Sequence, residues 1–225
     1  DDLQEKINKT DSLISLEDLY LPFKKKRKTK AETARNNGLE PLAKIIMSQN
    51  ARDINPIAEK YTSNEISTFE DALEGARFII AEWINERTDI RTNIRYQLER
   101  FATINTKVVK TKEQEEKAQK FKDYFAWSES LQRCPSHRLL AILRAQEEGF
   151  IRVKIEIDDE KALSKIEERI IRSQNDCSQQ IELAIKDAYK RLLFPSLSNE
   201  ILGLVKEKAD EIAIQVFAKN LKQLL

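Results

Sequence analysis

The segment from Thr68 to Ile84 carries a strong helical pattern. Thr68 and Asp71 have the spacing of a capping box, in which a Thr side chain and an acid three residues later satisfy each other's backbone N–H groups. Apolar residues then recur at helical spacing on one face: Phe69, Ala72, Leu73, Ala76, Ile79, Ile80, Trp83 and Ile84. Because such a stripe is buried against other helices, we expect a mainly α-helical fold.

Helix signals recur along the rest of the chain. Pro22 and Gly38 are placed to end helices, Pro41 is placed to start one, and Pro195 is expected to close one before a final long helix. Glycine is rare, at 4 of 225 residues, and charged residues make up 34% of the chain. This composition favours long, exposed helices over tight turns, so we expect an elongated multi-helix assembly.

One segment has a different period. Between Phe150 and Asp158, apolar and charged residues alternate strictly, which is typical of a half-buried strand. A single strand leaves its backbone groups unsatisfied. We therefore expect one minor β-element, with a strand near 150–158 and a partner near 106–109.

A polar stretch from Thr62 to Glu65 is the best candidate for a domain boundary. It predicts a helical region with a basic loop at 1–65 and a central helical region at 66–225.

The overall charge does not favour any class of partner. Lys and Arg number 39 against 38 Asp and Glu, which gives a net charge of +1, so affinity for nucleic acid has to come from local patches. No signal peptide opens the chain and no 18-residue apolar run is present. Cys134 and Cys177 suit a reducing compartment, and we expect a cytoplasmic protein without membrane contact.

The strongest local patch is a basic run between residues 24 and 30. Six of its seven residues are cations, and they repel one another unless an anion lies nearby. Thr29 and Glu32 have capping-box spacing, so the run leads directly into a predicted helix. The run could be a solvated loop or one paired with acids elsewhere in the fold. Our candidate phosphate contacts are Lys24, Lys25, Lys26, Arg27, Lys28, Lys30 and Arg35.

Aromatic residues next to basic ones could stack on nucleobases. Tyr20 and Phe23 precede the basic run, where they could serve either as stacking platforms or as core anchors. A second, weaker cluster combines aromatic residues with nearby lysines: Tyr124, Phe125 and Trp127 with Lys117, Lys120 and Lys122. There the spacing of Phe121 and Phe125 favours core packing.

The sequence contains no recognisable catalytic or metal-binding motif. Cys134 and His137 have a metal-ligand spacing, but a closed zinc site needs four ligands and only Cys177 could add a soft one. We expect Ser136 to start a helix, and His137 and Arg138 to anchor neighbouring segments through hydrogen bonds. P-loop, dinucleotide-binding and zinc-protease patterns are also missing, so we expect neither an enzyme nor a cofactor.

Several motifs, in order, resemble those of the Tex family of bacterial transcription accessory proteins. The first is the Glu17–Lys24 stretch with the basic run and Thr29-Lys30-Ala31, followed by Gly38-Leu39-Glu40-Pro41-Leu42-Ala43. Asp71 to Glu82 resembles a further family helix, with Phe78 where an acid is usual. Later matches are Phe121 to Phe125, Pro135 to Gly149, and Phe217 to Leu225. Together they span nearly the whole chain.

This resemblance implies a nucleic-acid-binding transcription accessory factor that contacts RNA or DNA without sequence specificity. It also implies an internal fragment, with more sequence before residue 1 and with ribonuclease-H-like, helix-hairpin-helix and OB-fold RNA-binding domains after residue 225. An alternative role is a protein-interaction scaffold that braces these other domains or docks on RNA polymerase without binding nucleic acid itself.

Overall fold

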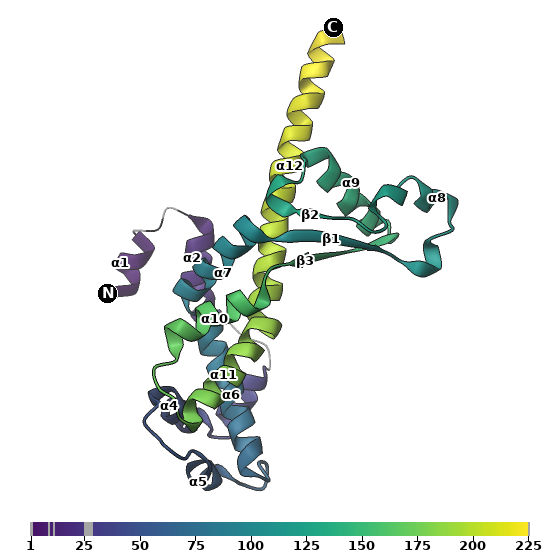
Figure 1. Cartoon of the computed structure of the whole chain (residues 1–225). Helices are drawn as coiled ribbons and strands as arrows, with labels where there is room; N and C mark the ends of the chain where they lie inside the picture. Colours follow the sequence, from purple (N-terminus) through teal and green to yellow (C-terminus); the bar gives the residue numbers. More distant parts are fainter. Residues whose placement is uncertain (1, 9, 11, 25–28, 225) are drawn as a thin grey trace. The chain divides into compact units, whose positions relative to one another are not determined.

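The computed structural model describes residues 2–8, 10, 12–24 and 29–224 (Figure 1). The chain is mainly α-helical with one small antiparallel sheet, which confirms the expected fold class. It forms two compact units: unit 1 contains 1–94 and 159–195, and unit 2 contains 95–158 and 196–225. The boundary expected near residue 65 divides the sequence in a different way and stays a prediction.

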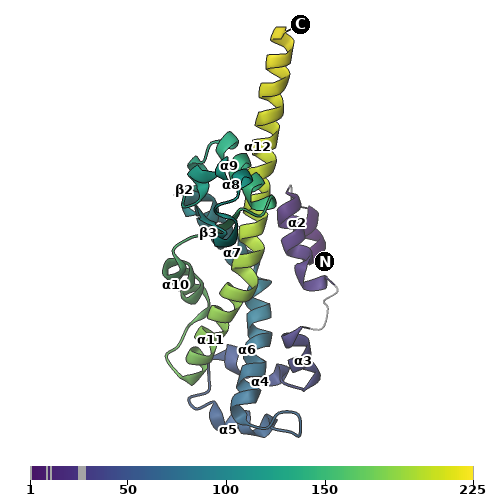
Figure 2. The ribbon, with the colours of Figure 1, turned by 90° about the vertical axis from the view of Figure 1, so that its right-hand side faces the viewer.

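Unit 1 is built around helix α6 (Phe69–Asn85), and the helices α3, α4 and α11 pack against it (Figures 1 and 2). The expected capping box is present: the Asp71 N–H donates to Thr68 Oγ1 at 3.1 Å, and the Thr68 N–H donates to Asp71 Oδ2 at 3.0 Å. The remaining elements are α1 (Asp2–Asn8), α2 (Leu13–Tyr20), η1 (Leu21–Phe23), α3 (Lys30–Asn36), α4 (Glu40–Ser48), α5 (Asn55–Ala58), η2 (Glu59–Tyr61), the first part of α7 (Thr88–Phe101), α10 (Asp159–Ile170), α11 (Asp176–Asp187) and η6 (Ala188–Leu193).

Unit 2 contains the sheet, whose strand order is β2-β1-β3 with antiparallel neighbours. Strands β1 (Thr103–Val108) and β3 (Ile151–Glu156) pair along their full length, which confirms the expected strand and its partner. The short strand β2 (Ser128–Ser130) was not expected. Helix α9 (Ser136–Glu147) packs against β3. The remaining elements are the end of α7, η3 (Lys110–Lys112), α8 (Glu116–Gln119), η4 (Lys122–Tyr124), η5 (Leu131–Arg133) and most of α12 (Phe194–Leu224).

The helix break expected at Pro195 is wrong. Helix α11 continues through η6, a π-helical segment, into α12 without interruption. A proline inside an α-helix removes one hydrogen bond and clashes with the carbonyl four residues earlier. The wider π turn just before Pro195 changes that hydrogen-bond pattern, so the helix tolerates the ring.

Within the described ranges, no helix is both long enough and apolar enough to cross a membrane.

Candidate nucleic-acid interface

The basic run begins and ends in the described part of unit 1. Lys24 follows η1 and is exposed, and Lys30 is the first residue of α3. The four predicted contacts between them, Lys25, Lys26, Arg27 and Lys28, lie outside the described residues.

A buried ion pair fixes the helix that precedes the run. Arg91 Nε of α7 donates to Asp18 Oδ1 of α2 at 2.5 Å, and both side chains are about 5% exposed. Two residues after Asp18, Tyr20 is 58% exposed, and Phe23 is 62% exposed. The two aromatic residues are therefore not core anchors, and their rings are accessible to a ligand immediately before the basic run.

An apolar hollow of about 500 Å³ lies beside these rings. Its lining consists of five apolar or aromatic residues and one acid: Ile7, Leu16, Leu19, Tyr20, Phe23 and Glu17. In the sequence these apolar residues directly precede the basic run. Flat apolar walls suit a ligand with an accessible ring face, as a nucleobase has.

Helix α3 begins where the sequence predicts. The Glu32 N–H donates to Thr29 Oγ1 at 3.0 Å, so Thr29 is the N-cap. The Lys30 ammonium then lies 4.4 Å from the centre of the Phe78 ring on α6. Lys30 remains exposed, and this cation–π contact holds its stem against unit 1.

Arg35, the last candidate contact, is engaged inside unit 1. Its Nη2 lies 2.6 Å from Glu82 Oε1, and its Nε lies 3.8 Å from Glu40 Oε2. The Glu82 side chain is only 9% exposed, so this pair helps to hold α3 against α6. A phosphate would have to compete with two carboxylates for Arg35, whereas none of the carboxylates among the described residues pairs with Lys24.

The second aromatic cluster belongs to the packing of unit 2. Phe121 is buried with its ring centre 5.9 Å from that of Phe150, which confirms the core role expected for Phe121. Trp127 is half-buried, and the Arg138 guanidinium lies 4.9 Å from its ring. This cluster therefore offers less ring surface to a nucleobase than Tyr20 and Phe23 do.

The residues around Cys134 form a structural hydrogen-bonded group. Arg138 Nη1 donates to Glu129 Oε2 at 2.7 Å, as expected of an anchoring residue. Burial raises the pKa of Glu129, but the neighbouring Cys134, Trp127 and Arg138 side chains outweigh it and leave that pKa lowered. Burial and the hydrogen bond to Glu129 raise the pKa of Cys134 to about 12.

His137 is exposed at the start of α9, and in the part of the chain that the structure describes no hydrogen bond holds it, so the anchoring expected of His137 is not seen. No group of three or more His, Cys, Asp and Glu side chains gathers there into a metal-binding arrangement.

Unit 2 presents a basic surface that sequence patterns did not reveal. Strand register places Lys107 directly opposite Arg152, with Lys154 two residues further along β3. The alternation between Phe150 and Asp158 predicts only that the charged residues of this strand share one face, Arg152 and Lys154 among them. Their alignment with Lys107 depends on the register, which the sequence did not supply.

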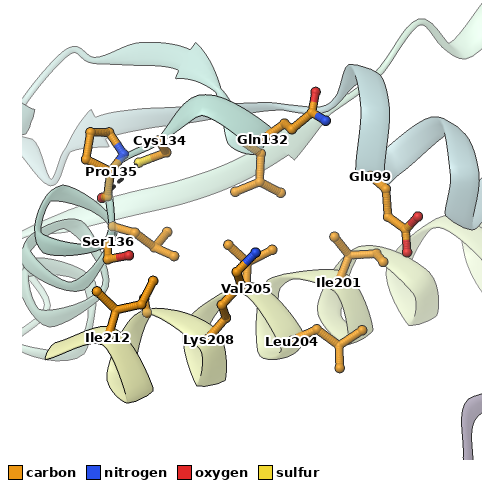
Figure 3. A pocket seen from close by; sticks show the side chains of 13 residues that line it. Glu99, Gln132, Cys134, Pro135, Ser136, Ile201, Leu204, Val205, Lys208 and Ile212 are labelled. Atoms are coloured by element: carbon orange, nitrogen blue, oxygen red, sulfur yellow. Dashed lines mark hydrogen bonds between the residues drawn. The ribbon is translucent and has the colours of Figure 1, made fainter. Parts of the chain in front are cut away.

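Unit 2 also contains an apolar groove of about 410 Å³ along α12 (Figure 3). Ile201, Val205 and Ile212 of α12 form one wall, and Cys134 and Pro135 contribute to the opposite wall. Further along α12 the apolar side chains are exposed to solvent: Ile214 is 66% exposed and Phe217 is 68% exposed.

Comparison with known proteins shows clear similarity over most of the chain. A family model described as "Tex central region-like" matches residues 49–217. The transcriptional accessory protein Tex of Neisseria gonorrhoeae is 38% identical over 231 residues, covering 100% of this chain and 30% of that protein. Protein tex of Bordetella pertussis is 33% identical over 240 residues, again covering 100% of this chain and 30% of the relative.

A more distant similarity extends to Homo sapiens. The S1 RNA-binding domain-containing protein 1 is 25% identical over 227 residues, covering 93% of this chain and 22% of that protein. The chain thus spans about 30% of the length of the bacterial relatives described above.

Proposed function

The chain belongs to the Tex family, which is associated with transcription, and from this we propose that it contacts the phosphate backbone of RNA or DNA through its basic loop, residues 24–30. The observation that carries the proposal is the exposure of Tyr20 and Phe23 directly before the cations. Exposed rings beside a basic segment are the arrangement that single-strand binders use. Contacts to phosphate position a chain on nucleic acid without reading its sequence.

The proposal assigns no catalytic residue to this chain. The bacterial relatives are longer proteins, and this chain covers 30% of their length. We propose that the chain supplies a binding or positioning surface within a protein of this kind.

Salt-dependent binding tests the proposal. Fluorescence anisotropy with labelled single-stranded RNA and with duplex DNA would compare the wild type with a variant in which Lys24, Lys25, Lys26 and Arg27 are all Ala. We expect affinity to fall between 50 and 200 mM salt, and the log–log slope for single strands to decrease by about 0.7 for each phosphate contact that the variant loses.

A matched variant changes four other exposed lysines to Ala: Lys60, Lys190, Lys206 and Lys219. It removes the same charge and should keep most of the binding. Equal loss in both variants would show that only net charge matters, and wild-type binding that does not respond to salt would rule out phosphate contact.

One observation favours a second candidate function, a protein-interaction scaffold. The end of α12 exposes Ile214, Phe217 and Leu221, which share one helix face. A row of exposed apolar side chains is typical of a protein–protein contact, and a component of the transcription machinery such as RNA polymerase is the partner class that the family implies. Binding of purified polymerase that survives high salt and is lost in Phe217→Asp would support this role.

A further inference from the structure

We propose that the exposed face of the three-stranded sheet in unit 2 is a second binding surface, for the phosphodiester backbone of single-stranded nucleic acid. The inference rests on the proposed function for its type of ligand, but it uses different residues from the basic loop. The register of the three strands assigns eight residues to this face: Thr103, Asn105 and Lys107 of β1, Ser128 and Ser130 of β2, and Arg152, Lys154 and Glu156 of β3.

The two faces of the sheet differ sharply in character. Residues that alternate with this set, such as Ile104, Ile151 and Ile155, are buried and form the core side of the sheet. On the other face Lys107 and Arg152 are exposed, and the Lys154 side chain is 74% exposed. The outer face is thus open to a ligand.

Two positive charges on this face repel each other and destabilise the sheet. Lys107 and Arg152 are direct cross-strand neighbours, and like charges in such a pair are destabilising. Neither side chain has an ion-pair partner among the described residues, whereas Lys154 Nζ lies 2.6 Å from Glu156 Oε1. An anion bound between Lys107 and Arg152 would remove the repulsion, so the pair suits a phosphate.

The remaining groups on the face suit the rest of a nucleic-acid backbone. Ser, Thr and Asn side chains are common contacts to phosphate and sugar oxygens, and Ser128 is exposed beside Asn105. Asn105 Nδ2 donates to Glu156 Oε2 at 3.0 Å, so the single carboxylate is held at the end of the face away from Lys107. None of the eight side chains is aromatic, which favours backbone contact over base stacking.

The size of the face favours one strand over a duplex. Three strands span about 10 Å across, at about 4.8 Å between neighbours. Arg152 and Lys154 are about 6.6 Å apart along β3, a spacing similar to that of consecutive phosphates in one nucleic-acid strand. We therefore assign the face to a single strand that lies across β1 and β3.

Anisotropy with a short labelled oligouridylate, an oligothymidylate of equal length and a duplex would test this assignment on the whole chain. In Lys107→Gln/Arg152→Gln we expect single-strand affinity at 50 mM salt to fall by about tenfold or more, and the salt slope to decrease by about 1.4. The control Lys206→Gln/Lys219→Gln removes two exposed lysines on α12 and should bind as the wild type does.

A third variant separates lost binding from lost structure. Lys107→Glu replaces the repulsive pair with an opposite-charge pair, so its melting temperature should rise while its binding falls. Binding that is abolished by the loop variant and unaffected by both sheet variants would overturn this inference and leave the proposed function intact. If the loop variant still binds and the sheet variants do not, the result would support the sheet face as the binding surface and contradict the proposed role of the basic loop. If the sheet variants lost affinity for the duplex and kept their affinity for single strands, that would also overturn the single-strand assignment.

Discussion

Phe78 shows how one residue can replace the charge expected at its position. The Lys30 ammonium lies 4.4 Å from its ring centre, and the Arg191 guanidinium lies 5.5 Å from it. The resemblance to the family indicates an acid at this position, and two neighbouring cations explain why an acid would fit. In this chain Lys30 and Arg191 instead contact the negative face of the Phe78 ring.

A substitution series at Phe78 tests this account. We expect Phe78→Ala to lower the free energy of unfolding by about 1–2 kcal/mol, because two cation–π contacts are lost. Phe78→Asp should stay within about 1 kcal/mol of the wild type, because ion pairs replace those contacts. Phe78→Lys, which adds a third cation, should be the least stable. Urea unfolding followed by circular dichroism would measure the order, and an Asp variant less stable than the Lys variant would contradict it.

Cys134 is predicted to be an unreactive thiol at neutral pH. Its pKa is raised to about 12, and the protonated form therefore dominates at every pH well below that value. Since the thiolate is the nucleophile, we expect alkylation at pH 8 to be on the order of 50-fold slower than for an ordinary cysteine.

Burial is the largest cause of the raised pKa of Cys134, and the variant Glu129→Gln measures how much Glu129 adds to it. Glu129 raises the pKa of Cys134 by its hydrogen bond and its charge, so removing that charge should lower the pKa and speed alkylation several-fold. Mass spectrometry of the modified peptides would follow Cys134 and Cys177 in one sample. The buried Cys177 serves as the internal control, because a faster reaction at both thiols would indicate general loosening instead.

At the scale of elements, a buried ion pair between Asp18 and Arg91 holds helix α2 against α7. Asp18 and Arg91 are both buried, and loss of one partner leaves a buried charge uncompensated. We expect Asp18→Asn to lower the free energy of unfolding by about 3 kcal/mol or more and to expose residues 12–24 to protease. Glu17→Gln changes an exposed acid next to it and should do neither. Equal protease resistance in the two variants would contradict this role.

Elements defined by local signals could be predicted from the sequence, whereas those defined by distant contacts could not. Helix α6 follows from its cap and apolar stripe, and the pairing of β1 with β3 follows from strict alternation and the need for a partner. Strand β2 has only three residues, Ser-Glu-Ser, which carry no periodicity. It exists because the backbone of β1 offers it hydrogen bonds. The candidate phosphate contacts were identified by charge density, but the engagement of Arg35 with Glu82 depends on how α3 packs on α6.

At the scale of the whole molecule, a net charge of +1 makes the location of each charge decisive. Several cations among the described residues have acidic neighbours, as Arg95 has Glu200 and Arg77 has Glu70. Such pairs cancel at a distance and give no long-range attraction for nucleic acid. Binding that depends on the basic loop or on the sheet face therefore has to be local, and it should respond to substitutions there far more than to equal changes of net charge elsewhere.

The exposed end of α12 leads to a prediction about the state of the chain in solution. Ile214, Phe217 and Leu221 recur at helical spacing, and they are 66%, 68% and 47% exposed. Because exposed apolar rows of this kind associate in water, we expect the isolated chain to self-associate as its concentration rises.

Sedimentation velocity over a range of concentrations would measure this self-association. The double variant Ile214→Asp/Phe217→Asp should remain monomeric at concentrations where the wild type forms larger species. Leu183→Asp, which removes a 47% exposed apolar residue on α11, should associate as the wild type does.

The dependence on salt distinguishes self-association through α12 from binding of nucleic acid. Association through α12 should persist at high salt, because burial of apolar surface does not depend on screened charges, whereas binding of a single strand should be lost. A wild type that stays monomeric throughout would show that the apolar row is too small to act alone, and it would remove the main support for the scaffold function.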